Sequence, residues 1–120
     1  MEIRSLDSSS FRNLRDQRLE LGPRLNLVVG DNGQGKTNLL EALALVSGRP
    51  SFRTTDLSVV PRNGAARAEL SARVRSGSLE TPLALQLVEG RREHFASGRK
   101  VGRLAAQSVA PSVFLTAWDL

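Results

Sequence analysis

The positions of apolar and polar residues change period along the chain, and these changes predict its secondary structure. In residues 18–21, leucine alternates with arginine and glutamate, which is typical of a strand with one solvent-exposed face. Gly22 and Pro23 then predict a turn. The nearly continuous aliphatic run at residues 25–29 predicts a strand that is buried on both faces of a sheet with parallel character.

A helical period follows, because the apolar residues between positions 36 and 48 recur at spacings of three and four. The residues that carry this period are Leu39, Leu40, Leu43 and Val46. Gly48 predicts the C-terminal end of the helix. The order of elements is therefore a strand, a glycine-rich loop and a helix.

Beyond Gly48 the period returns to two, which predicts strands. Residues 66–77 and 82–90 form an expected hairpin or meander, with Ser76 and Gly77 in a connecting loop longer than the tightest type. The alternating apolar residues are Ala68, Leu70, Ala72, Val74, Leu83, Leu85 and Leu87.

The last third of the chain predicts three short elements. Ser97 and Gly98 indicate another small hairpin, residues 103–108 a short helix, and residues 112–120 one more buried strand. The chain has no internal repeat, low-complexity tract or evident linker, so its 120 residues predict one domain.

The composition excludes several classes of protein. The absence of cysteine excludes a disulfide framework and a thiolate zinc site. No apolar run is as long as a membrane span, and the first ten residues lack the basic and apolar regions of a signal peptide. We therefore expect no membrane association and a cytoplasmic location.

The formal net charge of +5 is unevenly distributed. Residues 1–60 hold eight Lys and Arg against seven Asp and Glu, and residues 61–120 hold nine against five. A basic surface in the second half can attract nucleic acid. A solvated, arginine-rich surface explains the same charge, because the arginines are spread out and not clustered in blocks.

The glycine-rich loop carries the chemistry, because it fits the phosphate-binding pattern G-x-x-x-x-G-K-[ST]. Its residues are Gly30, Asp31, Asn32, Gly33, Gln34, Gly35, Lys36 and Thr37. The three glycines remove side chains that would block the approach of backbone N–H groups to polyphosphate. The strand before the loop and the helix after it supply the structural context that this pattern requires, so we expect an ATP-binding P-loop.

Lys36 and Thr37 have separate expected roles in this loop. Lys36 reaches the β- and γ-phosphates as a compact charge, a role that a planar guanidinium fits less well. This explains why one of only two lysines in an arginine-rich chain stands here. Thr37 places a hydroxyl on Mg²⁺.

Three functional classes share this loop or this charge. The first is the ATP-binding part of a larger P-loop ATPase. The second is a small P-loop phosphotransferase, for which Asp119 is the available Mg²⁺ residue. The third is a truncated product whose basic face binds DNA without nucleotide.

Three stretches distinguish these classes by resemblance to a known family. "FRNL" at 11–14, "LNLVVGDNGQGKTNLLEAL" at 25–43 and "GRPSFRT" at 48–54 occur in an order that resembles the start of bacterial RecF proteins. These are DNA replication and repair ATPases related to the SMC and Rad50 heads of the ABC type. "GRREHFASGRKVGRL" and "SVFLTAWDL" resemble later segments more loosely, so the likeness covers the whole chain.

The resemblance implies a fold and a function. The fold is α/β, the N-terminal lobe of an ABC/SMC-type P-loop NTPase head, with a strand–helix unit and an antiparallel β meander. The family acts in DNA replication, recombinational repair and SOS induction. It binds single-stranded and gapped DNA in an ATP-dependent way, works with recombination mediator proteins, and forms an ATP-dependent homodimer. Arg12 and Asn13 match the family's "FRN" turn near the nucleotide, and Arg53 is a further candidate for a phosphate or partner contact.

The chain also departs from the family pattern. Ala117 and Trp118 replace a usual Pro-Glu pair, Ser97 replaces a common asparagine, and "GRPSFRT" carries one additional residue. Family members are much longer, so residues 1–120 are expected to be part of an incomplete head. The Walker B and signature motifs and the helical arm would lie outside it, and we expect no ATP hydrolysis by this chain alone.

Several single residues have competing interpretations. His94 is expected on the surface without a catalytic role, and Glu41 is expected to be solvated or ion-paired. Trp118 either stacks on a base or packs against an apolar strand. The arginines that either contact DNA phosphate or remain solvated are Arg91, Arg92, Arg99 and Arg103.

Overall fold

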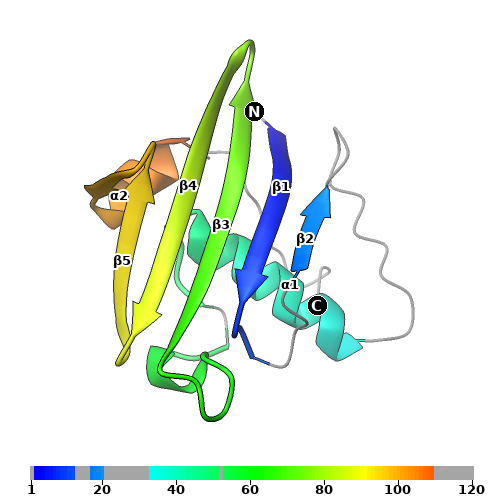
Figure 1. Ribbon diagram of the computed structural model, residues 1–120, viewed down its shortest axis with the longest axis vertical. Coiled ribbons are helices and arrows are strands. Elements are labelled where there is room, and N and C mark those ends of the chain that lie inside the picture. Colours follow the sequence, from blue (N-terminus) through cyan, green and yellow to red (C-terminus); the bar gives the residue numbers. More distant parts are fainter. Residues whose placement is uncertain (1, 13–16, 21–32, 52, 110–120) are drawn as a thin grey trace.

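In a computed structural model, the described part of the chain is a single twisted sheet with two helices on one of its faces (Figure 1). The structure describes residues 2–12, 17–20, 33–51 and 53–109. Six strands are hydrogen-bonded in the order β2-β1-β3-β4-β5-β6, and each neighbouring pair is antiparallel. The strands are β1 (Glu2–Ser9), β2 (Gln17–Glu20), β3 (Arg67–Ser76), β4 (Leu79–Val88), β5 (Arg91–Ala96) and β6 (Arg99–Val101).

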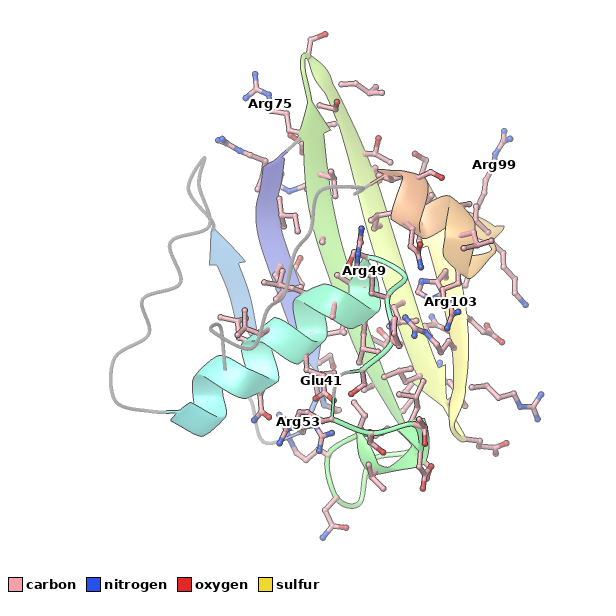
Figure 2. All side chains as sticks on the ribbon, turned by 180° about the vertical axis from the view of Figure 1, so that it is seen from behind. Glu41, Arg49, Arg53, Arg75, Arg99 and Arg103 are labelled. Atoms are coloured by element: carbon pink, nitrogen blue, oxygen red, sulfur yellow. The ribbon has the colours of Figure 1, made fainter. Side chains whose placement is uncertain are left out.

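The helices are α1 (Gly33–Val46) and α2 (Arg103–Val109), with a short 3-10 turn, η1 (Leu57–Val59), between α1 and β3. Figures 1 and 2, seen from opposite sides, place α1 and α2 on the same face of the sheet. No helix in the described ranges is long and apolar enough to cross a membrane.

The predicted alternation of residues on β3 and β4 is confirmed, and it builds the core. The residues expected to point inward on these strands are all buried, and Ala68, Leu70 and Ala72 lie opposite Leu87, Leu85 and Leu83 in the register. The apolar face of α1 covers this side of the sheet, with Leu39, Leu43 and Val46 in the same core cluster. The apolar faces predicted from the strand period and from the helical period therefore pack against each other as one sheet–helix interface.

The hairpins follow from local turn chemistry. β4 and β5 are joined by Glu89 and Gly90, and β5 and β6 by Ser97 and Gly98; each of these four residues has a positive φ. Two positive φ values in a two-residue connection are characteristic of the type I′ turn, whose twist matches that of the strands. The predicted hairpin at Ser97-Gly98 is confirmed.

The connection between β3 and β4 corrects one expectation. Ser76 pairs with Leu79, so only Gly77 and Ser78 form the loop, although the sequence suggested a longer one. Gly77 has a φ of +62°, which allows the tight turn. The predicted strands at 25–29 and 112–120 lie outside the described residues.

The predicted end of the first helix at Gly48 is also confirmed. Gly48 has a φ of +85°, its N–H donates to Leu45 O at 3.0 Å, and the N–H of Arg49 donates to Ala44 O at 2.9 Å. These two bonds form a Schellman motif, which satisfies carbonyls that the helix itself leaves without partners. The C-terminal end of α1 is thereby fixed at one residue.

Candidate phosphate-binding site

Helix α1 begins inside the predicted phosphate-binding loop. Gly33, Gln34, Gly35, Lys36 and Thr37 are its first five residues, and the structure describes their helical backbone. Gly30, Asp31 and Asn32, like Asn13, lie outside the described residues. The structure therefore shows the helix that the motif requires after the loop.

The start of α1 is chemically suited to an anion. The first backbone N–H groups of a helix have no acceptor within it, and the aligned peptide dipoles add partial positive charge there. The first turn of α1 contains no acidic residue that would repel phosphate. These properties fit the phosphate groups of the nucleoside triphosphate that the motif predicts.

One turn further along α1, a fully buried carboxylate gathers two arginines from other segments. Glu41 Oε1 accepts from Arg12 Nε at 2.5 Å, and Glu41 Oε2 accepts from Arg12 Nη2 at 3.0 Å. Arg53 Nη1 lies 3.4 Å from Oε1. Figure 2 shows Glu41 and Arg53 facing each other beside α1. We call Asn38, Glu41, Arg12, Ser51 and Arg53 the Glu41 cluster.

Ser51 and Asn38 complete the Glu41 cluster. The hydroxyl of Ser51 donates to Glu41 Oε2 at 2.7 Å and accepts from the backbone N–H of Arg53 at 3.0 Å. Arg53 Nη1 donates to Asn38 Oδ1 at 2.5 Å. The segment after α1 is therefore folded back onto the middle of the helix, at Asn38 and Glu41.

Arg12 is held by its backbone as well as by Glu41. Its φ is +45°, in the left-handed region that side-chain-bearing residues seldom adopt. Its N–H donates to Val60 O at 2.9 Å, and its carbonyl accepts from Arg62 Nε at 3.2 Å. Buried Phe11 pairs with Pro61 beside it. The surroundings thus fix a strained conformation, which is a frequent property of functional positions.

These contacts decide between the two interpretations of Glu41. It is ion-paired and not solvated, because the exposed fraction of its side chain is 0%. The sequence signalled this only weakly, through two polar residues, Asn38 and Glu41, three positions apart on a mostly apolar helix. Neither Ser51 nor Asn38 was identified as a site residue from the sequence.

The C-terminal end of α1 holds a second polar group. Arg92 on β5 donates from Nη2 to Leu45 O at 2.8 Å and from Nε to His94 Nε2 at 3.2 Å. A cation at this end of a helix is stabilised by the helix dipole. Burial lowers the pKa of Arg92 to about 10. The expectation that Arg92 is either solvated or contacts DNA is therefore replaced by a structural role.

His94 contradicts its prediction as a surface residue. Its side chain is buried, it accepts from Arg92, and its Nδ1 has no partner among the described residues. Burial is the largest cause that lowers its pKa to about 4, followed by the charges of Arg92 and Arg103. The prediction failed because β5 begins with three consecutive charged residues, and only the pairing of His94 with Leu85 on β4 shows that position 94 faces the core.

We expect His94 to make the protein less stable in mild acid. Its pKa is about 4 when folded against about 6.5 when unfolded, so the unfolded chain binds the extra proton first. Stability is then fully present above pH 6.5 and falls by up to about 3 kcal/mol as the pH drops to 4. Urea unfolding of wild type and His94→Gln at pH 7, 5.5 and 4.5 measures this. An equal loss in both proteins would contradict the assignment to His94.

The remaining basic candidates are on the surface. Arg91, Arg99 and Arg103 are exposed, as is Lys100, whose Nζ lies 4.0 Å from Glu93 Oε1. Figure 2 shows Arg99 and Arg103 on the side of β5 and α2. Trp118 and Asp119, the candidate stacking and Mg²⁺ residues, lie outside the described part of the chain.

Comparisons with known proteins agree with this geometry. The AAA domain family profile matches residues 5–81. The RecF protein of Chlamydia muridarum is 36% identical over 106 residues, 88% of this chain and 29% of that protein. RecF of Chlamydia trachomatis serovar D is 50% identical over 72 residues, 60% of this chain and 20% of that protein. The chain thus spans less than a third of the length of these relatives.

Solved structures match the fold. A structure of the recombination mediator protein RecF with ATP superposes with a TM-score of 0.73 at 33% identity, over 83% of this chain and 27% of that one. A structure from work on the ATP-driven dimerization of SMC ATPases gives 0.76 at 19% identity, over 99% and 83%. The predicted fold, an ABC/SMC-type P-loop NTPase head, is confirmed. The chain therefore belongs to the AAA domain family, and its sequence and fold match part of the RecF proteins.

Proposed function

We propose that this chain is the ATP-binding portion of a RecF-like protein that acts in DNA replication, recombinational repair and SOS induction. The observation that carries the proposal is the start of α1 inside a complete phosphate-loop motif, on the fold of an ATPase head. The relatives supply the biological context, since they are DNA replication and repair proteins, and one solved RecF structure contains ATP.

Each residue of the motif has a separate proposed role in binding the nucleotide. Backbone N–H groups of Gly30, Gly33 and Gly35 and of the first turn of α1 contact the phosphates. Lys36 neutralises the β- and γ-phosphates, and Thr37 coordinates Mg²⁺ through its hydroxyl. When bound, Mg²⁺ would neutralise part of the negative charge of the phosphates. Asp31, Asn32 and Gln34 complete the loop.

Arg12 and Asn13 lie beside the nucleotide in this proposal. The support for Arg12 is its position, because its Nε lies 2.5 Å from Oε1 of Glu41, one helical turn beyond Thr37 on α1. A strained residue with an additional bidentate anchor is pre-organised, so little conformational entropy is lost when an anion binds.

The DNA partner is single-stranded or gapped DNA, with recombination mediator proteins and a second RecF-like head as further partners in the cytoplasm. The exposed basic residues of β5, β6 and α2 support a phosphate-binding surface, since they lie in the half of the chain with excess positive charge. The ATP-driven dimerization of SMC ATPases, which share this fold, supports a head-to-head arrangement.

Titration calorimetry tests the nucleotide proposal directly. The folded chain with Mg²⁺ is expected to bind ATP and its slowly hydrolysed analogues and to lose this binding when the P-loop is altered. The same protein is expected to retain DNA more weakly as salt increases. No heat from any of these nucleotides with folded protein would refute the proposal. Transfer of phosphate to a nucleoside or small molecule would favour the phosphotransferase instead.

A further inference from the structure

We propose that Glu41 is a positioning residue for the nucleotide site, and that it holds Arg12 and Arg53 together so that their guanidinium groups face the terminal phosphate. This inference rests on the proposed ATP-binding function and adds to it a residue outside the P-loop. It concerns discrimination between a triphosphate and a diphosphate.

The first step is the geometry of the carboxylate. Glu41 receives four contacts from three donor side chains, two of them from Arg12 and one each from Arg53 and Ser51. The bidentate contact fixes the plane of the Arg12 guanidinium as well as its distance. The donors come from the loop after β1 and the segment after α1, so one carboxylate determines the relative position of two otherwise separate loops.

The second step is the place of Glu41 on α1. It lies four residues, one helical turn, beyond Thr37. Side chains on a helix lean toward its N-terminus. The cluster is therefore displaced toward the turn that carries Lys36 and Thr37, which is the turn expected to face the phosphates.

The third step is charge. Two guanidinium groups meet one carboxylate, so the Glu41 cluster, taken over the described residues, has an excess of one positive charge. The side chains of Arg12 and Arg53 are only 18% and 26% exposed, which limits compensation by water. A partly buried excess charge is stabilised by a further anion. The terminal phosphate of a bound nucleotide supplies that charge.

The fourth step is the orientation of the donors. Arg12 uses Nε and Nη2 on Glu41, and Arg53 uses Nη1 on Glu41 and Asn38. A guanidinium carries five N–H donors, so each arginine keeps a second edge for a phosphate oxygen. Glu41 thus orients the two arginines and still leaves each of them N–H donors for a phosphate oxygen.

Glu41→Gln tests the inference, because it keeps the shape of the side chain and removes its charge. We expect the affinity for ATP to fall about tenfold while that for ADP changes little, since only ATP presents the terminal phosphate. Calorimetry with ATP and ADP in Mg²⁺ gives the ratio of the two affinities. Loss of folding stability alone leaves this ratio unchanged.

Arg92→Gln is the matched control, because it removes a charged contact to the other end of α1. It is expected to lower stability and to leave the ATP-to-ADP ratio at the wild-type value. In a double-mutant cycle, Arg12→Ala combined with Glu41→Gln is expected to lower the ratio little more than either change alone. Full additivity would show that Glu41 does not act through Arg12.

Arg12→Lys replaces Glu41→Gln if the latter does not fold. It keeps the charge but cannot span both carboxylate oxygens, so the same fall in the ratio is expected. An unchanged or higher ratio in the folded variant, with wild type binding ATP through Lys36, overturns the positioning role alone. Failure of wild type to bind ATP overturns both this role and the proposed function.

Discussion

Replacing Lys36 with alanine is expected to lower the affinity of the chain for ATP by about a hundredfold or more, without unfolding it. The lysine ammonium is the only cation in the motif, and its loss removes a charge-assisted donor to both the β- and the γ-phosphate. Alanine is the best helix former, so the first turn of α1 is preserved. Calorimetry with ATP and Mg²⁺, together with a thermal melt, measures both quantities.

Lys100→Ala is the natural control for this experiment, because it removes the only other lysine of the chain. Lys100 lies on β6 with 68% of its side chain exposed and a 4.0 Å contact to Glu93. Exposed pairs of this kind contribute little to stability. Its replacement should leave ATP affinity unchanged. Unaltered affinity in Lys36→Ala would mean that the glycine-rich turn does not bind phosphate.

Much of the fold could be predicted because its strongest signals are local. The alternation of Ala68 to Val74 and the spacing of Leu39 to Val46 each depend only on burying one face of one element. Gly48 and the Ser97-Gly98 pair marked their turns through backbone conformations that few residues adopt. Elements with such self-contained signals were placed correctly.

Strand β1 shows what the sequence could not reveal. Residues 2–9 are mostly charged or serine, so they carry little apolar periodicity, and no strand was predicted there. β1 nevertheless lies inside the sheet between β2 and β3. Ser5 is buried in it, and its hydroxyl accepts from Arg73 Nε at 3.0 Å. A strand stabilised by neighbours and by long-range side-chain bonds leaves little trace in its own residues.

The candidate site likewise has one part that the sequence predicted and one part that it did not. The P-loop was visible in the sequence because phosphate binding needs glycine, lysine and a hydroxyl at fixed short spacings. The Glu41 cluster was not, because Glu41 meets Arg12 across 29 positions and Ser51 across 10. The local sequence around Arg12 contains no signal that predicts its ion pair with Glu41. Only the folding of two loops onto α1 brings the charges together.

The closeness of α2 to α1 leads to the second large effect. An alanine Cβ at Gly48 would lie 2.4 Å from the carbonyl oxygen of Arg103 and 3.1 Å from the backbone nitrogen of Gln107. Backbone atoms cannot rotate away as a side chain can. The carbonyl of Gly48 also accepts from Gln107 Nε2 at 2.9 Å, so the first turn of α2 rests directly on the end of α1.

Gly48→Ala is therefore expected to destabilise the protein by about 4 kcal/mol. Roughly 1–2 kcal/mol comes from forcing alanine to a φ of +85°, and the remainder from displacing α2. Gly64→Ala separates the two causes, because Gly64 has a φ of +89° with nothing within 4 Å of the added Cβ. Urea unfolding of both variants should give a clearly larger loss for Gly48→Ala. Equal losses would mean that α2 does not pack on Gly48 in solution, because conformational strain alone would then account for both.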